Sequence, residues 1–139
     1  MPKHKSTAKL VENVRTLVDN SRPHTIVCDL PAVKGGNDTG PTALELAIMA
    51  LSDCAATIFA DVAKQSNIDI KKLEVVAEAE KPADSPILKG VKLKVNVAAK
   101  ARKQLIEAIW RRTEAKCPVV KIFTESIPIE VELSTETVK

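Results

Sequence analysis

Residues 35–54 read Gly-Gly-Asn-Asp-Thr-Gly-Pro-Thr-Ala-Leu-Glu-Leu-Ala-Ile-Met-Ala-Leu-Ser-Asp-Cys and join a glycine-rich turn to a long apolar helix. Thr42 and Glu45 have the spacing of a capping box, in which each side chain accepts a hydrogen bond from the backbone N–H of the other residue. Apolar residues then recur at helical spacing. We therefore expect a helix that ends near Gln65–Asn67 and carries Cys54 in its middle.

Two strands are predicted before this helix, because β-branched and aliphatic residues are frequent over 8–18 and 24–30. The break between them, Asn20-Ser21-Arg22-Pro23, is a turn signal and predicts a hairpin. Residues 31–40 are expected to form a loop, with a tight turn at its two glycines. The glycine pattern matches neither a P-loop nor a dinucleotide fingerprint, so we expect no nucleotide cofactor.

Alternating apolar and charged residues predict two further strands over 73–80 and 91–98. One polar face carries Glu and the other carries Lys, so antiparallel pairing would bring opposite charges together. The remaining elements are expected to be a helix over 101–114 with Leu105, Ile106, Ile109 and Trp110 facing inward, a short helix beginning at Cys117-Pro118, and a last strand containing Ile127, Ile129, Val131 and Leu133.

This order of elements, β-β-α-β-β-α-α-β, predicts an α+β fold in which an antiparallel sheet accompanies a long central helix. The chain has 139 residues, which is the size of one ordinary domain. We expect a single domain over 1–139, with frayed tails at 1–6 and 134–139.

The composition argues against nucleic-acid and membrane partners. Lys and Arg number 21 and Asp and Glu 18, a net charge of +3 that would attract a polyanion only weakly. Aromatic residues make up 2% of the chain, too few for platforms that stack on single-stranded nucleic acid. The polar start of the chain predicts no signal peptide, and we expect no window approaching the roughly 18 apolar residues that a membrane span needs. We therefore expect a soluble, cytoplasmic protein whose three cysteines are mainly thiols.

Cys54 and Cys117 are the candidates for redox chemistry. A reactive Cys54 would need a cation nearby to form its thiolate, and the candidates are Arg15 and Arg22 on and after the first predicted strand. Cys117 precedes a proline, which favours the first position of a helix, so this thiol would lie at an N-cap where the helix dipole stabilises a thiolate. The alternatives are a buried apolar role for Cys54 and a surface turn for Cys117.

The other candidate residues have simpler interpretations. Glu45 lies nine residues before Cys54, so it should face away from that cysteine and serve the capping box. Cys28 is expected in the core on the face of Ile26 and Leu30. His24 and Cys28 could share a strand face, but two ligands do not make a metal site, and we expect no metal.

Together these segments resemble the OsmC/Ohr family of thiol-dependent peroxidases over nearly the whole chain. The resemblance rests on Arg22-Pro23-His24-Thr25, Asp29-Leu30-Pro31, residues 35–42, Leu44-Glu45-Leu46, Ala50-Leu51-Ser52-Asp53-Cys54 and Cys117-Pro118-Val119. It implies an intertwined homodimer with two sites at the subunit interface, a peroxidatic Cys54 and a resolving Cys117.

The best characterised branches of this family carry a Glu ten residues before the peroxidatic cysteine, bonded to an active-site Arg. Leu44 occupies that position here, and Asp53 stands before Cys54 where a small residue is usual. The chain therefore resembles the broader OsmC-like branch. Arg15 matches the family Arg best by position, and Arg22 is the second choice.

The resemblance implies reduction of organic hydroperoxides or hydrogen peroxide in oxidative-stress defence. The thiolate would attack the distal peroxide oxygen, an alcohol or water would leave, and the two cysteines would close a disulfide that a dithiol reductant reopens. The missing Glu motivates an alternative, a non-catalytic dimer that binds an apolar or thiol-bearing small molecule.

Overall fold

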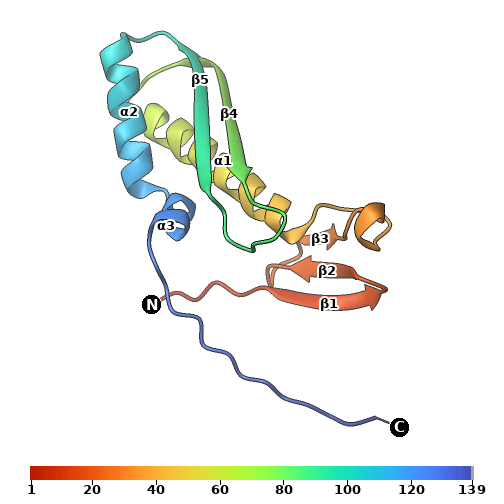
Figure 1. Cartoon of the computed structure of the whole chain (residues 1–139). Helices are drawn as coiled ribbons and strands as arrows, with labels where there is room; N and C mark the ends of the chain where they lie inside the picture. The colour runs from red at the N-terminus through yellow and green to blue at the C-terminus, as the bar shows by residue number, and fades with distance from the viewer. Residues whose placement is uncertain (139) are drawn as a thin grey trace. The chain divides into compact units, whose positions relative to one another are not determined.

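The computed structural model describes residues 1–138, and its contacts divide the chain into two compact units. The first unit contains Met1–Asp53 and Glu74–Asn96, and the second contains Cys54–Leu73 and the chain from Val97 onward. Figure 1 traces the elements from the amino-terminal strands to the carboxyl-terminal segment.

The first unit begins with a three-stranded antiparallel sheet in the order β1 (Thr7–Glu12), β2 (Arg15–Asp19), β3 (Thr25–Cys28). The single strand predicted over 8–18 is wrong, because the chain reverses after Glu12. Asn13 adopts the left-handed conformation, with φ of 51°, which Asn tolerates better than most residues. The hairpin predicted at residues 20–23 is confirmed, since Asp19 pairs with Thr25 across that turn.

The loop predicted after the hairpin is also present and contains a short 3-10 helix, η1 (Ala32–Lys34). η1 ends at Gly35, whose φ of 92° is readily available only to glycine. Backbone hydrogen bonds then fold the loop back on itself: Gly36 donates to the carbonyl of Pro31 at 3.1 Å, and Asp38 donates to the carbonyl of Leu30 at 3.0 Å.

The long helix α1 (Ala43–Gln65) follows this loop, and both hydrogen bonds of its capping box are present. The backbone N–H of Thr42 donates to Glu45 Oε1 at 2.9 Å, and the N–H of Glu45 donates to Thr42 Oγ1 at 3.1 Å. The helix ends at Gln65, and Asn67 turns the chain with φ of 56°, so the predicted end is confirmed.

By length and composition alone, α1 could cross a membrane, so the expectation that no window of the chain is apolar enough for a span is wrong. Residues 46–63 contain only two charged side chains, those of Asp53 and Asp61. The core helix of a soluble protein passes the same test, and the second half of α1 supplies the buried residues Ala55, Phe59, Val62 and Ala63.

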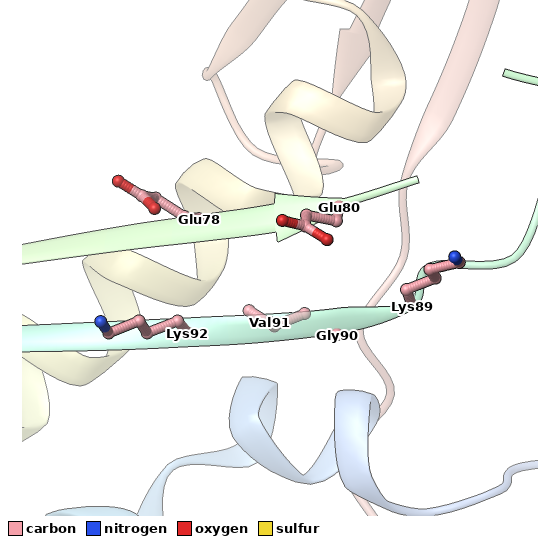
Figure 2. Close-up of a pocket in the computed structure, with 6 residues that line it drawn as sticks. All are labelled: Glu78, Glu80, Lys89, Gly90, Val91 and Lys92. Atoms are coloured by element: carbon pink, nitrogen blue, oxygen red, sulfur yellow. The ribbon is translucent and has the colours of Figure 1, made fainter. Parts of the chain in front are cut away.

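Two strands follow, β4 (Ile70–Glu80) and β5 (Gly90–Ala99), and they pair antiparallel as predicted. The Lys89 N–H donates to the carbonyl of Glu80 at 2.7 Å beside their connecting loop. Half-buried and exposed residues alternate along β4, which confirms the predicted period of two. Glu74 accepts a hydrogen bond from Asn96 at 3.3 Å. Near the loop, four charged side chains line one pocket (Figure 2): Glu78, Glu80, Lys89 and Lys92.

The second unit contains the end of β5, from Val97, and then α2 (Lys103–Lys116) and α3 (Pro118–Thr124), which lie close to the predicted helices. The core joins α1 to α2 through Phe59, Val62, Ala63 and Ile109, and Ile106 and Trp110 pack against it. The inward orientation predicted for Leu105 is wrong, since it is 43% exposed. The α-helical repeat places Leu105 roughly 90° around α2 from the stripe formed by Ile106, Ile109 and Trp110.

The strand predicted near the carboxyl end is absent, because residues 126–138 have no regular secondary structure. Its apolar residues are exposed: Ile127 62%, Ile129 85%, Val131 81% and Leu133 84%. A strand needs a neighbour for its ladder hydrogen bonds, and in the chain from 1 to 138 no strand pairs with this segment. The observed order is therefore β1-β2-β3-η1-α1-β4-β5-α2-α3, an α+β arrangement with antiparallel sheets.

Candidate functional site

Cys54 and Cys117 are in contact within the second unit. Their Sγ atoms are 2.6 Å apart, although 63 residues separate them in the sequence. Cys54 is half-buried on α1, and Cys117 is completely buried. Sulfur atoms this close need little backbone movement to join, so the pair is suited to reversible disulfide chemistry.

Cys117 owes its position to the end of α2. Its N–H donates to the carbonyl of Thr113 at 2.9 Å and completes the last turn of α2. Pro118 then occupies the first position of α3, where a residue without an N–H loses no helical hydrogen bond. The predicted N-cap placement of Cys117 is confirmed, and its burial removes the alternative of a surface turn.

Cys28 lies in the first unit at the end of β3 and is 8% exposed, so its predicted burial is confirmed. Its expected companion on the same face, Ile26, is 45% exposed and does not share that burial. Cys28 thus has the predicted structural role, and the two cysteines that are in contact are the ones predicted for redox chemistry, Cys54 and Cys117.

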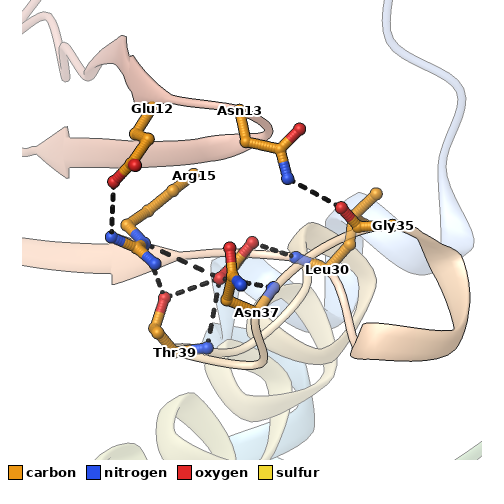
Figure 3. Close-up of polar contacts among 8 residues, drawn as sticks. Glu12, Asn13, Arg15, Leu30, Gly35, Asn37 and Thr39 are labelled. Carbon is orange, nitrogen blue, oxygen red and sulfur yellow. Dashed lines mark hydrogen bonds and ion pairs between the residues drawn. The ribbon is translucent and has the colours of Figure 1, made fainter.

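Arg15 begins β2 in the first unit and makes several polar contacts (Figure 3). Its Nε donates to Thr39 Oγ1 at 2.9 Å and lies 3.7 Å from Asp29 Oδ2. Its Nη1 donates to Glu12 Oε2 at 3.3 Å. The Arg15 side chain is 26% exposed and that of Glu12 is 74% exposed. The Glu12 contact is therefore screened by water, whereas the contacts to Thr39 and Asp29 are the better protected ones.

Asp29 is the buried carboxylate of this cluster, with its side chain 1% exposed. Its Oδ2 accepts hydrogen bonds from the Thr39 hydroxyl at 2.6 Å and from the N–H groups of Thr39 and Asn37 at 3.2 Å, and its Oδ1 accepts from the Leu30 N–H at 2.8 Å. The hydroxyl of Thr39, aided by the backbone donors and opposed by burial, lowers the pKa of Asp29 from 3.8 to about 2. Asp29 is therefore a carboxylate at neutral pH.

The glycine-rich loop, residues 35–40, wraps around the Asp29 carboxylate. A Cβ on Gly36 would lie 2.0 Å from the carbonyl oxygen of Leu30 and 2.8 Å from Asp29 Oδ1. A Cβ on Gly40 would lie 2.0 Å from the carbonyl oxygen of Val27. These glycines allow the loop to approach the end of β3 closely enough for its N–H groups to reach Asp29, a role beyond the predicted tight turn.

The sequence patterns point to Arg15 but do not identify its neighbours Asp29 and Thr39. Asp29 directly follows β3, and Thr39 lies ten residues later in the glycine-rich loop. In the sequence, only the pair Gly35-Gly36 indicates that the backbone of this loop packs closely against another segment, and it does not identify that segment.

Two further candidates have other surroundings. The backbone N–H of Arg22 donates to Asn20 Oδ1 at 2.9 Å in the β2–β3 turn, where Arg22 is exposed. Glu45 is held by its capping box, and the Thr42 N–H that it binds lowers the pKa of Glu45 below its usual range. Both residues belong to the first unit, as does Arg15.

Leu44, at the position where the family resemblance expects a Glu, lines a largely apolar pocket. The other residues lining it are Glu45, Ile48, Met49 and Ala79. Within residues 1–138, no group of three or more His, Cys, Asp or Glu residues is arranged to hold a metal ion. His24 instead lies 3.0 Å from the Asn20 amide, measured from its Nδ1 to Asn20 Nδ2.

A family model for OsmC-like proteins matches residues 35–132, which include the glycine-rich loop, α1 and both cysteines of the pair. The chain belongs to the OsmC-like protein family. No curated protein matches this OsmC-like chain.

Solved structures support the fold of this OsmC-like protein. An OsmC-like protein from Mycoplasma pneumoniae is 17% identical with a TM-score of 0.77, and the match covers 88% of each chain. A putative osmotic stress induced and detoxification response protein from Psychrobacter arcticus 273-4 is 20% identical, with a TM-score of 0.73 over 87% of this chain and 88% of the other. An organic hydroperoxide resistance protein OsmC from Legionella pneumophila is 18% identical, with a TM-score of 0.59 over 87% and 88%.

Proposed function

We propose that this OsmC-like protein is a thiol peroxidase that reduces organic hydroperoxides or hydrogen peroxide. The observation that carries the proposal is the 2.6 Å separation of the Cys54 and Cys117 sulfur atoms. Membership of a family whose structural neighbours include a hydroperoxide resistance protein gives it further support. We assign Cys54 as the peroxidatic cysteine, because it is half-buried and Cys117 is completely buried.

In the first step, the Cys54 thiolate attacks the distal oxygen of ROOH, forms an S–O bond and breaks the O–O bond. The leaving RO⁻ takes a proton and departs as an alcohol, or as water when the substrate is hydrogen peroxide. The sulfur is oxidised by two electrons to a sulfenic acid, and the peroxide is reduced by the same two electrons.

In the second step, Cys117 attacks the Cys54 sulfenic acid, forms the S–S bond and releases water. A dithiol reductant of the cell then reduces the disulfide and becomes a disulfide itself. Such a cycle suits a reducing compartment, and we propose that the protein acts in the cytoplasm.

We further propose that Arg15 supplies the positive charge that stabilises the Cys54 thiolate and the developing alkoxide. Arg15 is always protonated at physiological pH. Its Nε donates to Thr39 and its Nη1 donates to Glu12, and these contacts hold the guanidinium in place. Arg22 is the second candidate for this role.

An intertwined homodimer is the proposed assembly. Four aliphatic side chains of the segment 127–133 alternate in the strand pattern and are 62–85% exposed. A second copy could supply the missing neighbour, since an extended apolar segment gains both ladder hydrogen bonds and burial by joining a sheet edge.

The test combines thiol titration with peptide mass spectrometry after one equivalent of a hydroperoxide. We expect loss of two thiols per chain and a Cys54–Cys117 linkage within one chain, with Cys28 unmodified. Cys54→Ser should abolish turnover, because a serine hydroxyl is not ionised at neutral pH. A Cys28 linkage, or oxidation of Cys117 with Cys54 intact, would contradict the assignment.

A second function, binding of an apolar or thiol-bearing small molecule without turnover, is favoured by one observation. Leu44, Ile48, Met49 and Ala79 line a pocket at the start of α1. The same thiol titration separates the two functions, since a binding protein should keep all its thiols after exposure to peroxide.

A further inference from the structure

We propose that Thr39 and Asp29 are positioning residues that hold the guanidinium of Arg15 in one orientation. The inference deepens the proposed function and rests on the role given there to Arg15. Neither residue is assigned to reacting atoms; both act through the arginine.

The Thr39 hydroxyl is the central link. Its single proton is donated to Asp29 Oδ2 at 2.6 Å, a distance typical of a strong charge-assisted hydrogen bond. The hydroxyl oxygen can then accept, and it does so from Arg15 Nε at 2.9 Å. The three groups form a chain in which the carboxylate fixes the hydroxyl and the hydroxyl fixes the guanidinium, and such chains strengthen each member.

Asp29 is an anchor with little freedom of its own. Three backbone N–H groups, from Leu30, Asn37 and Thr39, hold its oxygens in addition to the hydroxyl. Its side chain is 1% exposed and its charge faces Arg15 Nε at 3.7 Å. Because the backbone donors fix the position of the Asp29 carboxylate, Arg15 keeps its contact with Asp29 in only one orientation of the guanidinium.

The Glu12 contact does not serve this purpose equally well. Glu12 is exposed and bonds Arg15 Nη1 at 3.3 Å, and exposed ion pairs of this kind contribute little. The orientation of the guanidinium therefore depends on the glycine-rich loop, which supplies Thr39 and two of the N–H groups that hold Asp29.

The first experiment measures Arg15 directly in the reduced full-length protein. The exchange rate of its Nε–H with water is followed by ¹⁵N NMR in wild type, Thr39→Val, Thr39→Ser and Thr25→Val. Valine keeps the shape of threonine and the Thr39 N–H, so only the hydroxyl is lost. Thr25→Val is the matched control. It makes the same change at an exposed position of β3, in the sheet that contains Arg15, where valine is well tolerated.

We expect Nε–H exchange to accelerate by about tenfold in Thr39→Val, the value of one hydrogen bond to a charged group. Thr39→Ser restores the hydroxyl and should behave as wild type, and so should Thr25→Val. Unchanged exchange in Thr39→Val would overturn the inference whatever the protein catalyses.

The second experiment measures single-turnover reduction of a hydroperoxide by the same variants and by Arg15→Ala with and without Thr39→Val. We expect Thr39→Val to slow the reaction by about tenfold in the wild-type background and to have no effect once Arg15 is absent. Rescue by Thr39→Ser would exclude general damage to the loop. An equal loss in both backgrounds would show that Thr39 does not act through Arg15 and would overturn the inference.

The two experiments distinguish failure of the inference from failure of the proposed function. If wild type consumes no peroxide, or if Arg15→Ala reacts as fast as wild type, the proposed chemistry or the role of Arg15 is wrong. The NMR result would still decide whether the Thr39 hydroxyl holds the guanidinium.

Discussion

Asp29 combines almost complete burial with a full negative charge, and its environment explains how. Four hydrogen bonds replace the water that the carboxylate loses, and Arg15 provides a nearby positive charge. A buried charge satisfied in this way is stable, whereas a partly satisfied one would be costly. This single side chain therefore connects the end of β3 to the glycine-rich loop.

Asp29→Asn should lower the thermal stability of the protein at pH 7 by several degrees. An amide NH₂ would replace one acceptor oxygen and face backbone donors, and the charge opposite Arg15 would be lost. Circular dichroism melting of both proteins is the measurement. Equal melting temperatures would mean that the hydrogen bonds around Asp29 add no net stability.

The stability difference between wild type and Asp29→Asn should also depend on pH. The folded-state pKa of Asp29 is lowered to about 2 from 3.8, so its contribution is present above the unfolded value and is lost as pH falls from about 4 toward 2. The charged groups around it are Arg15, which stays protonated, and Glu12, which contacts Arg15 rather than Asp29. Urea unfolding midpoints of the two proteins should differ at pH 7 and approach each other at pH 4 and pH 2.5. A difference that stays constant over this range would contradict the lowered pKa of Asp29.

Cys117→Ser should react with one equivalent of peroxide per chain and then stop. Without the second thiol the Cys54 sulfenic acid cannot close a disulfide and proceeds to higher oxidation states. Intact mass spectrometry should show additions of one or more oxygens at Cys54. Cys28→Ser is the matched control, because Cys28 is also buried yet lies in the other unit, and it should retain full turnover.

The start of α1 shows how a helix and the loop before it depend on the same few residues. Thr42 and Glu45 satisfy two N–H groups that the first helical turn cannot pair, and the loop that presents them also surrounds Asp29. The capping box and the contacts around Asp29 lie next to each other in the sequence but use different side chains, so each can be altered by mutation without changing the other.

Glu45→Gln should leave peroxide turnover within a few fold of wild type, because glutamine also fits the capping box. Thr42→Ala, by contrast, removes the N-cap acceptor and should cost about 1 kcal/mol of unfolding free energy. Turnover assays and urea unfolding of both variants are the measurements. A fall in turnover of about a hundredfold in Glu45→Gln would instead identify Glu45 as an acid–base group.

For the chain as a whole, the exposed carboxyl-terminal segment is the feature that a single copy leaves unexplained. Ile127 to Leu133 has the composition of a strand, and an isolated strand gains nothing from that composition in water. The assembly of two copies is the proposal that accounts for it.

Ile129→Lys with Val131→Lys should shift the protein from dimer to monomer. Both side chains are more than 80% exposed in the single chain, so the change should matter only if a partner covers them. Analytical ultracentrifugation at micromolar concentration gives the mass. Glu130→Lys with Glu132→Lys is the control on the alternate positions, and a wild type that is folded and monomeric would refute the dimer.

Several features were readable from sequence because they depend on neighbours within a few residues. The capping box at Thr42 and Glu45, the apolar repeat of α1, the period of two along β4 and the proline after Cys117 are local patterns, and each appears in the structure. The family was readable for a related reason, since these patterns occur together at fixed spacing.

Other features needed distant parts of the chain to meet. The contact of Cys54 with Cys117 spans 63 residues, and that of Arg15 with Thr39 spans 24, so no local pattern could reveal either distance. The reversal at Asn13 divided one predicted strand into two, because a left-handed turn residue outweighed a β-rich composition. The segment 127–133 shows the converse: its pattern predicts a strand, but a strand exists only where another offers it hydrogen bonds.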